Sequence, residues 1–369
     1  MRFPIRLAIA LLAIFGLVAA ACGDDADTSV GTAPADAPTV VVTTNILGDV
    51  VTNLVGDQLN VETIMPVGAD PHDFQPSAQQ VATIGEAAVL ITNGAAFEEG
   101  LLDVIESAEG DGVPVFEAIG AVGTIEFGEG GHDHDEHEDD HDEEHEGEDH
   151  ADEDDHEDEE HKDEDDHEGE DDHDEEHEDE HGDDDHDEHE HDGDDPHFFT
   201  DPARMALAAD GIADFLIATV DGIDADALRA TADDYIAELE ALDADVASIL
   251  EGLSDAQRVL ITNHEVFGYF ADRYDFEVVG TVIPGGSTLD GTSAQTIAEL
   301  AEVIEDEGVA AIFSDTSSSD ELAQTLAGEV GDVQVVELFT ESLGDQDSEG
   351  ATYLEMVRSN AERIAEALG

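Results

Sequence analysis

The sequence has no tryptophan, one cysteine and only nine basic residues in 369 positions. A single cysteine, Cys22, excludes an internal disulfide. The scarcity of lysine and arginine argues against nucleic acid as a partner, because phosphates require a basic footprint. The chain has 99 acidic residues against these nine basic ones, which gives a formal net charge of -90. This balance suits a cationic ligand or a salty environment.

Residues 128–195 contain almost no apolar side chains. From residue 131 to residue 195 there are 15 histidines, 43 acidic residues and one lysine. Such a segment cannot bury a core, so we expect it to be solvated and disordered. Imidazole is the usual side-chain ligand of zinc, copper and nickel, and its alternation with acids favours a low-affinity metal tract over a polyacid that only confers solubility. Candidate ligands in the tract include His132, His134, His137, His141, His145, His186, His189 and His191.

Residues 1–22 predict a secretory signal peptide, with a charged start, an apolar run from Ile5 to Ala21 and small residues before Cys22. A cysteine at this place resembles the lipobox of bacterial lipoproteins, in which the thiol is acylated. The alternative is an exported protein with an incidental cysteine. Residues 23–38 are expected to be a flexible tether. The predicted location is therefore the outer face of the cytoplasmic membrane, with a lipid anchor, or the periplasm.

Short β-branched strands alternate with helical segments on both sides of the tract, which predicts an α/β fold with parallel sheets. The first strand is expected at Thr39–Thr44, followed by a helix capped by Asn45. Apolar residues recur every three or four positions over residues 224–253, which predicts one long amphipathic helix. An isolated coiled coil is the competing interpretation of that pattern. Ligands of parallel sheets gather beyond the carboxyl ends of the strands.

Three segments resemble ligand motifs of the solute-binding proteins of zinc and manganese ABC transporters. They are Gly68–Ser77, which contains Asp-Pro-His, Asp195–Pro202, which contains the same tripeptide, and Asn263–Phe270, which contains Asn-His-Glu. The resemblance implies that His72, His197 and His264 bind the ion. Zinc-type members have histidine in the third segment and manganese-type members have glutamate, and an acidic, His-rich loop precedes the second motif in zinc-type members. The family's carboxylate ligand is expected at Asp315, at the end of a strand.

The resemblance also implies the domain organisation and the partners. We expect an N-terminal lobe over residues 39–223 with the insertion 128–195, a rigid linking helix over residues 224–253, and a C-terminal lobe over residues 254–369. The metal site should lie in the cleft between the lobes. The expected function is the capture of Zn²⁺ and its delivery to an ABC permease by a monomer.

The donor set itself points to transport of the ion rather than catalysis. Outside the tract the only histidines are His72, His197 and His264. Three imidazoles with the Asp315 carboxylate suit tetrahedral zinc and leave no coordination position open for water. A metalloprotease helix would need a second histidine four residues after His264, and that position is Gly268. The remaining alternatives are a manganese carrier of the same family, a metal storage or chaperone protein that uses the tract, a hydrolase with Glu265 as its base, and a surface adhesin.

Overall fold

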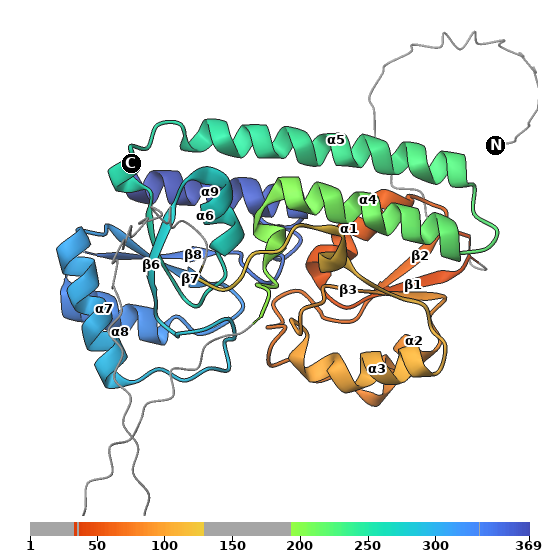
Figure 1. Cartoon of the computed structure of the whole chain (residues 1–369), viewed down its shortest axis with the longest axis horizontal. Helices are drawn as coiled ribbons and strands as arrows, with labels where there is room; N and C mark the ends of the chain where they lie inside the picture. Colours follow the sequence, from red (N-terminus) through yellow and green to blue (C-terminus); the bar gives the residue numbers. More distant parts are fainter. Residues whose placement is uncertain (1–32, 35–36, 129–192, 332) are drawn as a thin grey trace, which may run out of the picture.

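The computed structural model describes residues 33–34, 37–128, 193–331 and 333–369. The described part of the chain forms two α/β lobes, each built on a four-stranded sheet in which every pairing is parallel. This confirms the predicted fold class. Figure 1 shows the two lobes side by side beneath a long helix, α5.

The N-terminal sheet has the strand order β2-β1-β3-β4. Helices cover both faces of this sheet at its central strands. The buried residues there are Val40, Val41 and Val42 of β1 and all four residues of β3. The strands are β1 (Thr39–Val42), β2 (Asn60–Thr63), β3 (Val89–Thr92) and β4 (Val115–Glu117). The helices of this lobe are α1 (Asn45–Val55), α2 (Ala78–Gly85), η1 (Glu99–Leu101), α3 (Leu102–Gly110), η2 (Ala118–Ala121), η3 (Phe198–Thr200) and α4 (Pro202–Thr219).

The C-terminal sheet repeats this arrangement with the order β6-β5-β7-β8. Its strands are β5 (Val259–Thr262), β6 (Glu277–Thr281), β7 (Ala311–Asp315) and β8 (Gln334–Leu338). Its helices are η4 (Asp255–Gln257), α6 (Gly268–Tyr274), α7 (Ala294–Glu307), α8 (Glu321–Val330) and α9 (Tyr353–Leu368). In each sheet the strand order reverses between the two inner strands, which are β1 and β3 in the first sheet and β5 and β7 in the second. Ligands of such folds bind at this point, beyond the carboxyl ends of the strands.

Helix α5 (Ala225–Leu250) has 26 residues and joins the lobes. At 1.5 Å per residue it is about 39 Å long. Its buried residues, among them Leu228, Tyr235 and Leu250, form one stripe at intervals of three or four positions. They pack into a core shared with α1, α4 and α9. The single long helix predicted from this pattern is present, with Asp224 as its N-cap, but it ends at Leu250 and not at Leu253. Because α5 packs along both lobes, it restricts their relative movement.

Direct contacts also join the lobes. The Asn45 side chain donates to Ser342 Oγ at 3.0 Å and accepts from the Leu343 amide at 2.7 Å. The cap of α1 is Thr44, not Asn45 as the sequence suggested, because Asn45 makes these contacts instead. None of the helices in the described residues is long and apolar enough to span a bilayer.

Candidate metal centre

Four buried side chains from the two lobes meet at the centre of the molecule: His72, His197, His264 and Glu341. Their ligand atoms all lie within 4.8 Å of one another. His72 is in the loop after β2, His264 follows β5 and Glu341 follows β8, so three of the four extend from the carboxyl ends of parallel strands. His197 precedes η3, at the point where the described chain resumes after the tract. The three predicted histidines are thus brought together.

One carboxylate oxygen is the focus of the three rings. Glu341 Oε1 is 2.8 Å from His72 Nε2, 3.1 Å from His264 Nε2 and 3.4 Å from His197 Nε2. The other oxygen, Glu341 Oε2, has no hydrogen-bond partner among the described residues. Three imidazole nitrogens and one carboxylate in a buried site form a donor set that suits a tetrahedral divalent ion.

The fourth member of this group is Glu341 and not Asp315, the residue predicted from the sequence. Asp315 is at the end of β7 and is buried, but its Oδ1 accepts from the Ser317 amide at 2.9 Å and its Oδ2 from the Ser317 hydroxyl. Burial and the nearby Glu341 carboxylate raise the pKa of Asp315. Its carboxylate is therefore engaged beside the site, outside the set of converging ligand atoms.

A sequence signal for Glu341 existed but was weaker than the one for Asp315. Strands β7 and β8 are neighbours in the sheet and pair along their whole length, from Ala311 with Gln334 to Asp315 with Leu338. An acidic residue just beyond either strand reaches the same edge of the sheet. Asp315 is the last residue of its strand, whereas Glu341 lies three residues beyond β8, and only the path of the intervening Phe339 and Thr340 decides between them.

Two of the three imidazoles have a carboxylate at their second nitrogen. His72 Nδ1 is 3.0 Å from Glu99 Oε1, and His197 Nδ1 is 2.7 Å from Asp195 Oδ1. His264 Nδ1 has no partner among the described residues. Metal-ligating histidines commonly donate this second N–H to a carboxylate, which fixes the ring and the tautomer. The N-terminal half of the site is therefore held in place more firmly than the C-terminal half.

The electrostatics follow from this burial. Burial lowers the pKa of His197, but the charges and hydrogen bonds of Asp195 and Glu341 outweigh it and raise that pKa to about 9. The pKa of His72 is also raised, since contact with Glu341 outweighs burial. Burial raises the pKa of Glu341, but His264, His197 and His72 together bring it well below its usual range. Protons and a metal ion therefore compete for the same imidazoles.

Aromatic rings form the wall of the site on the N-terminal side. The Phe97 ring packs edge-on against His72 and His197, with centroid distances of 5.3 and 5.5 Å. The turn that places Phe97 has positive φ at Gly94, Ala95 and Ala96, with values of 90°, 49° and 57°. Alanine rarely adopts this conformation. Strain of this kind persists only where the surroundings impose it, which is common at functional sites.

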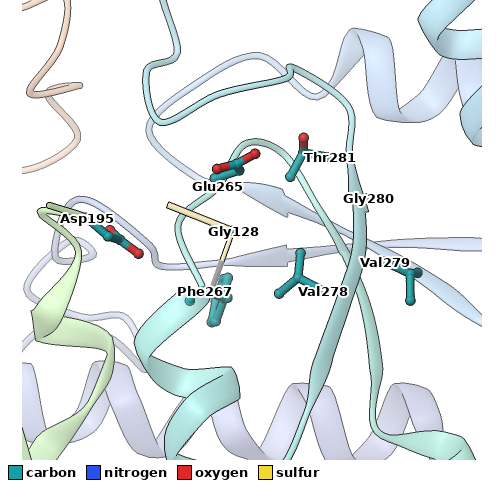
Figure 2. A pocket seen from close by; sticks show the side chains of 9 residues that line it. Gly128, Asp195, Glu265, Phe267, Val278, Val279, Gly280 and Thr281 are labelled. Atoms are coloured by element: carbon teal, nitrogen blue, oxygen red, sulfur yellow. The ribbon is translucent and has the colours of Figure 1, made fainter. Parts of the chain in front are cut away.

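Two cavities adjoin the centre. One of about 520 Å³ is bordered by His72, Phe97 and Glu99 of the N-terminal lobe and by Ser287 and other residues of the β6–α7 loop. A smaller one of about 140 Å³ lies beside Asp195 and Phe267. Figure 2 shows Asp195 and Glu265 at the edge of the smaller cavity, near Gly128. The centre itself is buried, and of these two cavities only the larger one is lined by one of the four converging residues, His72.

Three predictions fall wholly or largely on residues outside the described ranges. They are the signal peptide of residues 1–22 with its acylated Cys22, the tether of residues 23–38, and the metal tract with His132, His134, His137, His141, His145, His186, His189 and His191. All three stay predictions.

A buried centre of three imidazoles and one carboxylate, set between two parallel α/β lobes joined by one long helix, defines a metal-binding solute-binding protein. The chain belongs to the family described as zinc-uptake complex component A, periplasmic, whose model matches residues 40–367. Members of this family are the metal-binding components of ABC transport and not enzymes, so the hydrolase alternative is excluded.

Relatives with both metal names are similar to this chain. It is 22% identical to the manganese-binding lipoprotein MntA of Halalkalibacterium halodurans, over 97% of each chain. It is 26% identical to the zinc-binding lipoprotein AdcA of Streptococcus pneumoniae over 84% of this chain, where it spans about half of the longer relative (52%). Among solved structures, the periplasmic zinc-binding protein TroA of Treponema pallidum matches with a TM-score of 0.69 and 23% identity, over 90% of this chain and 99% of that one. That likeness supports the fold.

Proposed function

We propose that this protein captures Zn²⁺ outside the cytoplasmic membrane and delivers it to an ABC permease. The observation that carries the proposal is the convergence of three imidazole Nε2 atoms on Glu341 Oε1 at 2.8, 3.1 and 3.4 Å in a buried site. In the zinc complex His72, His197, His264 and Glu341 would be the ligands, at about 2.0 to 2.2 Å from the ion. Asp315 would remain outside the coordination sphere.

The donor chemistry favours zinc. Imidazole suits zinc, while carboxylate and carbonyl oxygens suit manganese. Three nitrogens against one carboxylate is a zinc-like ratio, and the second acid nearby, Asp315, is engaged by Ser317. Two relatives, AdcA of Streptococcus pneumoniae and TroA of Treponema pallidum, are named as zinc-binding proteins.

The position of the site between the lobes supplies the transport mechanism. His72 and His197 belong to the N-terminal lobe, His264 and Glu341 to the C-terminal lobe, so a bound ion ties the two lobes together. Binding stabilises that arrangement by mass action, and a permease can recognise it. Release follows when the permease favours an arrangement in which the four ligands no longer converge.

The His-rich tract and the lipid anchor complete the proposal. The tract ends at Asp195, two residues before His197, so it continues directly into the segment that carries a ligand of the buried centre. We assign it the role of a low-affinity antenna that passes zinc to this centre. Acylation of Cys22 would keep the monomeric protein at the membrane beside its permease.

The decisive experiment is a zinc titration with manganese competition. It uses the full chain, a chain in which Gly131–Asp194 is replaced by a short linker, and the His264→Ala variant of the shortened chain. We expect one tight zinc site in the shortened chain, resistant to manganese and lost in the variant. Absence of a tight site from the shortened chain, with tight sites in the full chain, would instead mean that the tract is the principal binder and would favour a storage or chaperone role.

Manganese transport is the second candidate function. It is favoured by the full-length similarity to a relative named as manganese-binding, MntA. In the same titration, displacement of zinc by equimolar manganese would establish this candidate and overturn the zinc assignment.

A further inference from the structure

One oxygen of Glu99 contacts both a metal-centre histidine and the opposite lobe. Glu99 Oε1 is 3.0 Å from His72 Nδ1, and it accepts a hydrogen bond from Ser287 Oγ at 2.6 Å. His72 and Glu99 belong to the N-terminal lobe, whereas Ser287 is in the loop between β6 and α7 of the C-terminal lobe. Asp195 also has a carboxylate oxygen at the Nδ1 atom of a histidine of the centre, His197. The hydrogen bonds of its side chain with the His197 ring and the His197 amide stay within the N-terminal lobe.

The geometry of His72 links this contact to the ligand atom. His72 Nε2 is directed at Glu341, 2.8 Å away, so this is the nitrogen that would bind an ion. A neutral imidazole that binds through Nε2 must carry its proton on Nδ1. That proton then points at Glu99. In the other tautomer the Nδ1 lone pair faces the carboxylate, and the hydrogen bond is lost. The Glu99 carboxylate therefore favours the metal-binding tautomer.

The β6–α7 loop, residues 282–293, is held against the N-terminal lobe by a second hydrogen bond. Thr288 Oγ1 donates to Asp70 Oδ2 at 2.6 Å, two residues before His72. Gly286 lies against the Phe127 ring so closely that an added Cβ would be 2.2 Å from it. With Glu99 and His72, residues of this loop border the 520 Å³ cavity. The loop is thus part of the wall between the buried centre and the outside.

We propose that Glu99 is a positioning residue that holds His72 in its metal-binding tautomer and, through Ser287, couples occupancy of the centre to closure of the β6–α7 loop. The proposal rests on the proposed metal-carrier function. When the ion occupies His72 Nε2, the Nδ1 proton fixes Glu99, and Glu99 in turn fixes Ser287. The loop then slows escape of the ion from the centre. Without the ion, only the hydrogen bond between His72 and Glu341, among the described residues, holds the His72 ring toward the C-terminal lobe, so the ring with Glu99 and the loop move apart more readily.

The test uses the full chain and the variants Glu99→Ala, Glu99→Gln and Ser287→Ala, with Asp103→Ala as a control for loss of an exposed acid on the neighbouring helix. Each protein receives one equivalent of zinc. We measure the zinc dissociation constant, the rate of zinc loss to excess chelator and the hydrogen exchange of residues 282–293. The His264→Ala variant shows which kinetic phase belongs to the buried centre and which to the tract. Melting temperatures of the metal-free proteins show whether each variant folds.

We expect Glu99→Ala to weaken zinc binding by about 10- to 100-fold, as loss of such outer partners does elsewhere, with Glu99→Gln in between. Ser287→Ala should weaken affinity only by the few-fold that the coupling supplies, because linkage is reciprocal, but it should speed zinc loss several-fold and remove the zinc-dependent protection of the loop. Asp103→Ala should match the wild type. Wild-type affinity and loop protection in Glu99→Ala would overturn the inference, as would normal protection in Ser287→Ala. If the wild-type chain has no kinetic phase sensitive to His264→Ala, the carrier function itself fails.

Discussion

The two lobes have matching sheets but equip their halves of the metal centre differently. In the N-terminal half, His72 and His197 each have a carboxylate at Nδ1, from Glu99 and Asp195, and the Phe97 ring packs against both. In the C-terminal half, His264 Nδ1 and Glu341 Oε2 have no hydrogen-bond partner among the described residues. Both imidazoles of the N-terminal half have a carboxylate that orients them, whereas the ligands of the C-terminal half have fewer such partners.

This difference suggests an order of events. An ion can first meet the two imidazoles that are already oriented, and the C-terminal ligands then complete the site. Pre-orientation lowers the cost of binding at the first half, while the less constrained half can give up the ion when the lobes shift. The rigid helix α5 keeps such a shift small, because it packs along both lobes.

The largest effect should come from removal of the charge on Glu341. Glu341→Gln keeps the size of the side chain but removes the anionic ligand. We expect zinc affinity to fall on the order of a hundredfold to a thousandfold, which corresponds to a fraction of the binding free energy of a zinc site. Asp315→Asn is the matched control, since its partner Ser317 can still bond to an amide. Competition with a chromophoric chelator measures both. Equal losses in the two variants would restore Asp315 as a ligand.

The pH dependence should show that the proton on the N-terminal half competes with zinc. The pKa of His197 is raised from 6.5 to about 9, so at pH 7.5 zinc must displace a proton, and affinity should fall by up to about tenfold per pH unit as pH drops. Calorimetry in buffers of different ionisation enthalpy counts the protons released. Zinc binding at pH 7.5 without proton release would contradict this assignment.

The same shifts predict the stability of the metal-free protein. A raised folded pKa at His197 contributes stability that is complete below pH 6.5 and lost as pH rises through about 9. The lowered pKa of Glu341 contributes stability that is present above its ordinary value of 4.5 and lost in more acidic solution. Together these two shifts contribute most to the stability of the metal-free protein between pH 4.5 and 6.5, whereas bound zinc should shift their optimum upward. Urea denaturation across this range measures the change.

Hydrogen exchange tests the comparison of the two halves directly. On zinc binding, residues 263–267 and 339–343 of the C-terminal lobe should gain several-fold more protection than residues 70–75 and 195–200. The reason is that Glu99 and Asp195 already hold the N-terminal ligands in the metal-free protein. Exchange measured by mass spectrometry with and without zinc gives the answer. Equal gains in both halves would mean that the N-terminal half is not pre-oriented.

The smallest expected effect concerns the strained turn before Phe97. Ala96 is exposed and has a φ of 57°, a conformation that costs alanine roughly 1 to 2 kcal/mol. Ala96→Gly relieves that cost but raises the conformational entropy of the unfolded chain. We therefore expect the free energy of unfolding to increase by a net amount of about 0.5 kcal/mol. Ala241→Gly, at an exposed position within α5, should instead lose about 1 kcal/mol. Destabilisation by both would show that the turn is not strained.

Much of the fold could be predicted because it depends on local patterns. Periodic apolar residues identified α5, and the β-branched run from Thr39 identified β1, because a strand that is buried on both faces has a distinctive sequence. His72, His197 and His264 could be found because histidine is absent elsewhere outside the tract. For abundant residue types no such elimination is possible. With 99 acids in the chain, Glu341 was one candidate among many, and the role of Asn45 depends on contacts about 297 positions away.

The partners at the second imidazole nitrogens could not be predicted for a similar reason. Glu99 reaches His72 from a position 27 residues further along the chain, in a short 3-10 helix that follows the strained turn at Gly94, Ala95 and Ala96. A single helix that began at Phe97 would place Glu99 differently, but the chain forms a separate 3-10 helix at Glu99–Leu101. Tertiary packing, and not local propensity, fixes this part of the site.

The most direct test of the central claim is a crystal structure of the zinc-loaded shortened chain, with anomalous diffraction measured at the zinc edge. One strong peak between the lobes is predicted, at about 2.0 to 2.2 Å from Nε2 of the three histidines and from a Glu341 oxygen. A peak coordinated by Asp315 in place of Glu341, or no peak between the lobes, would contradict the account.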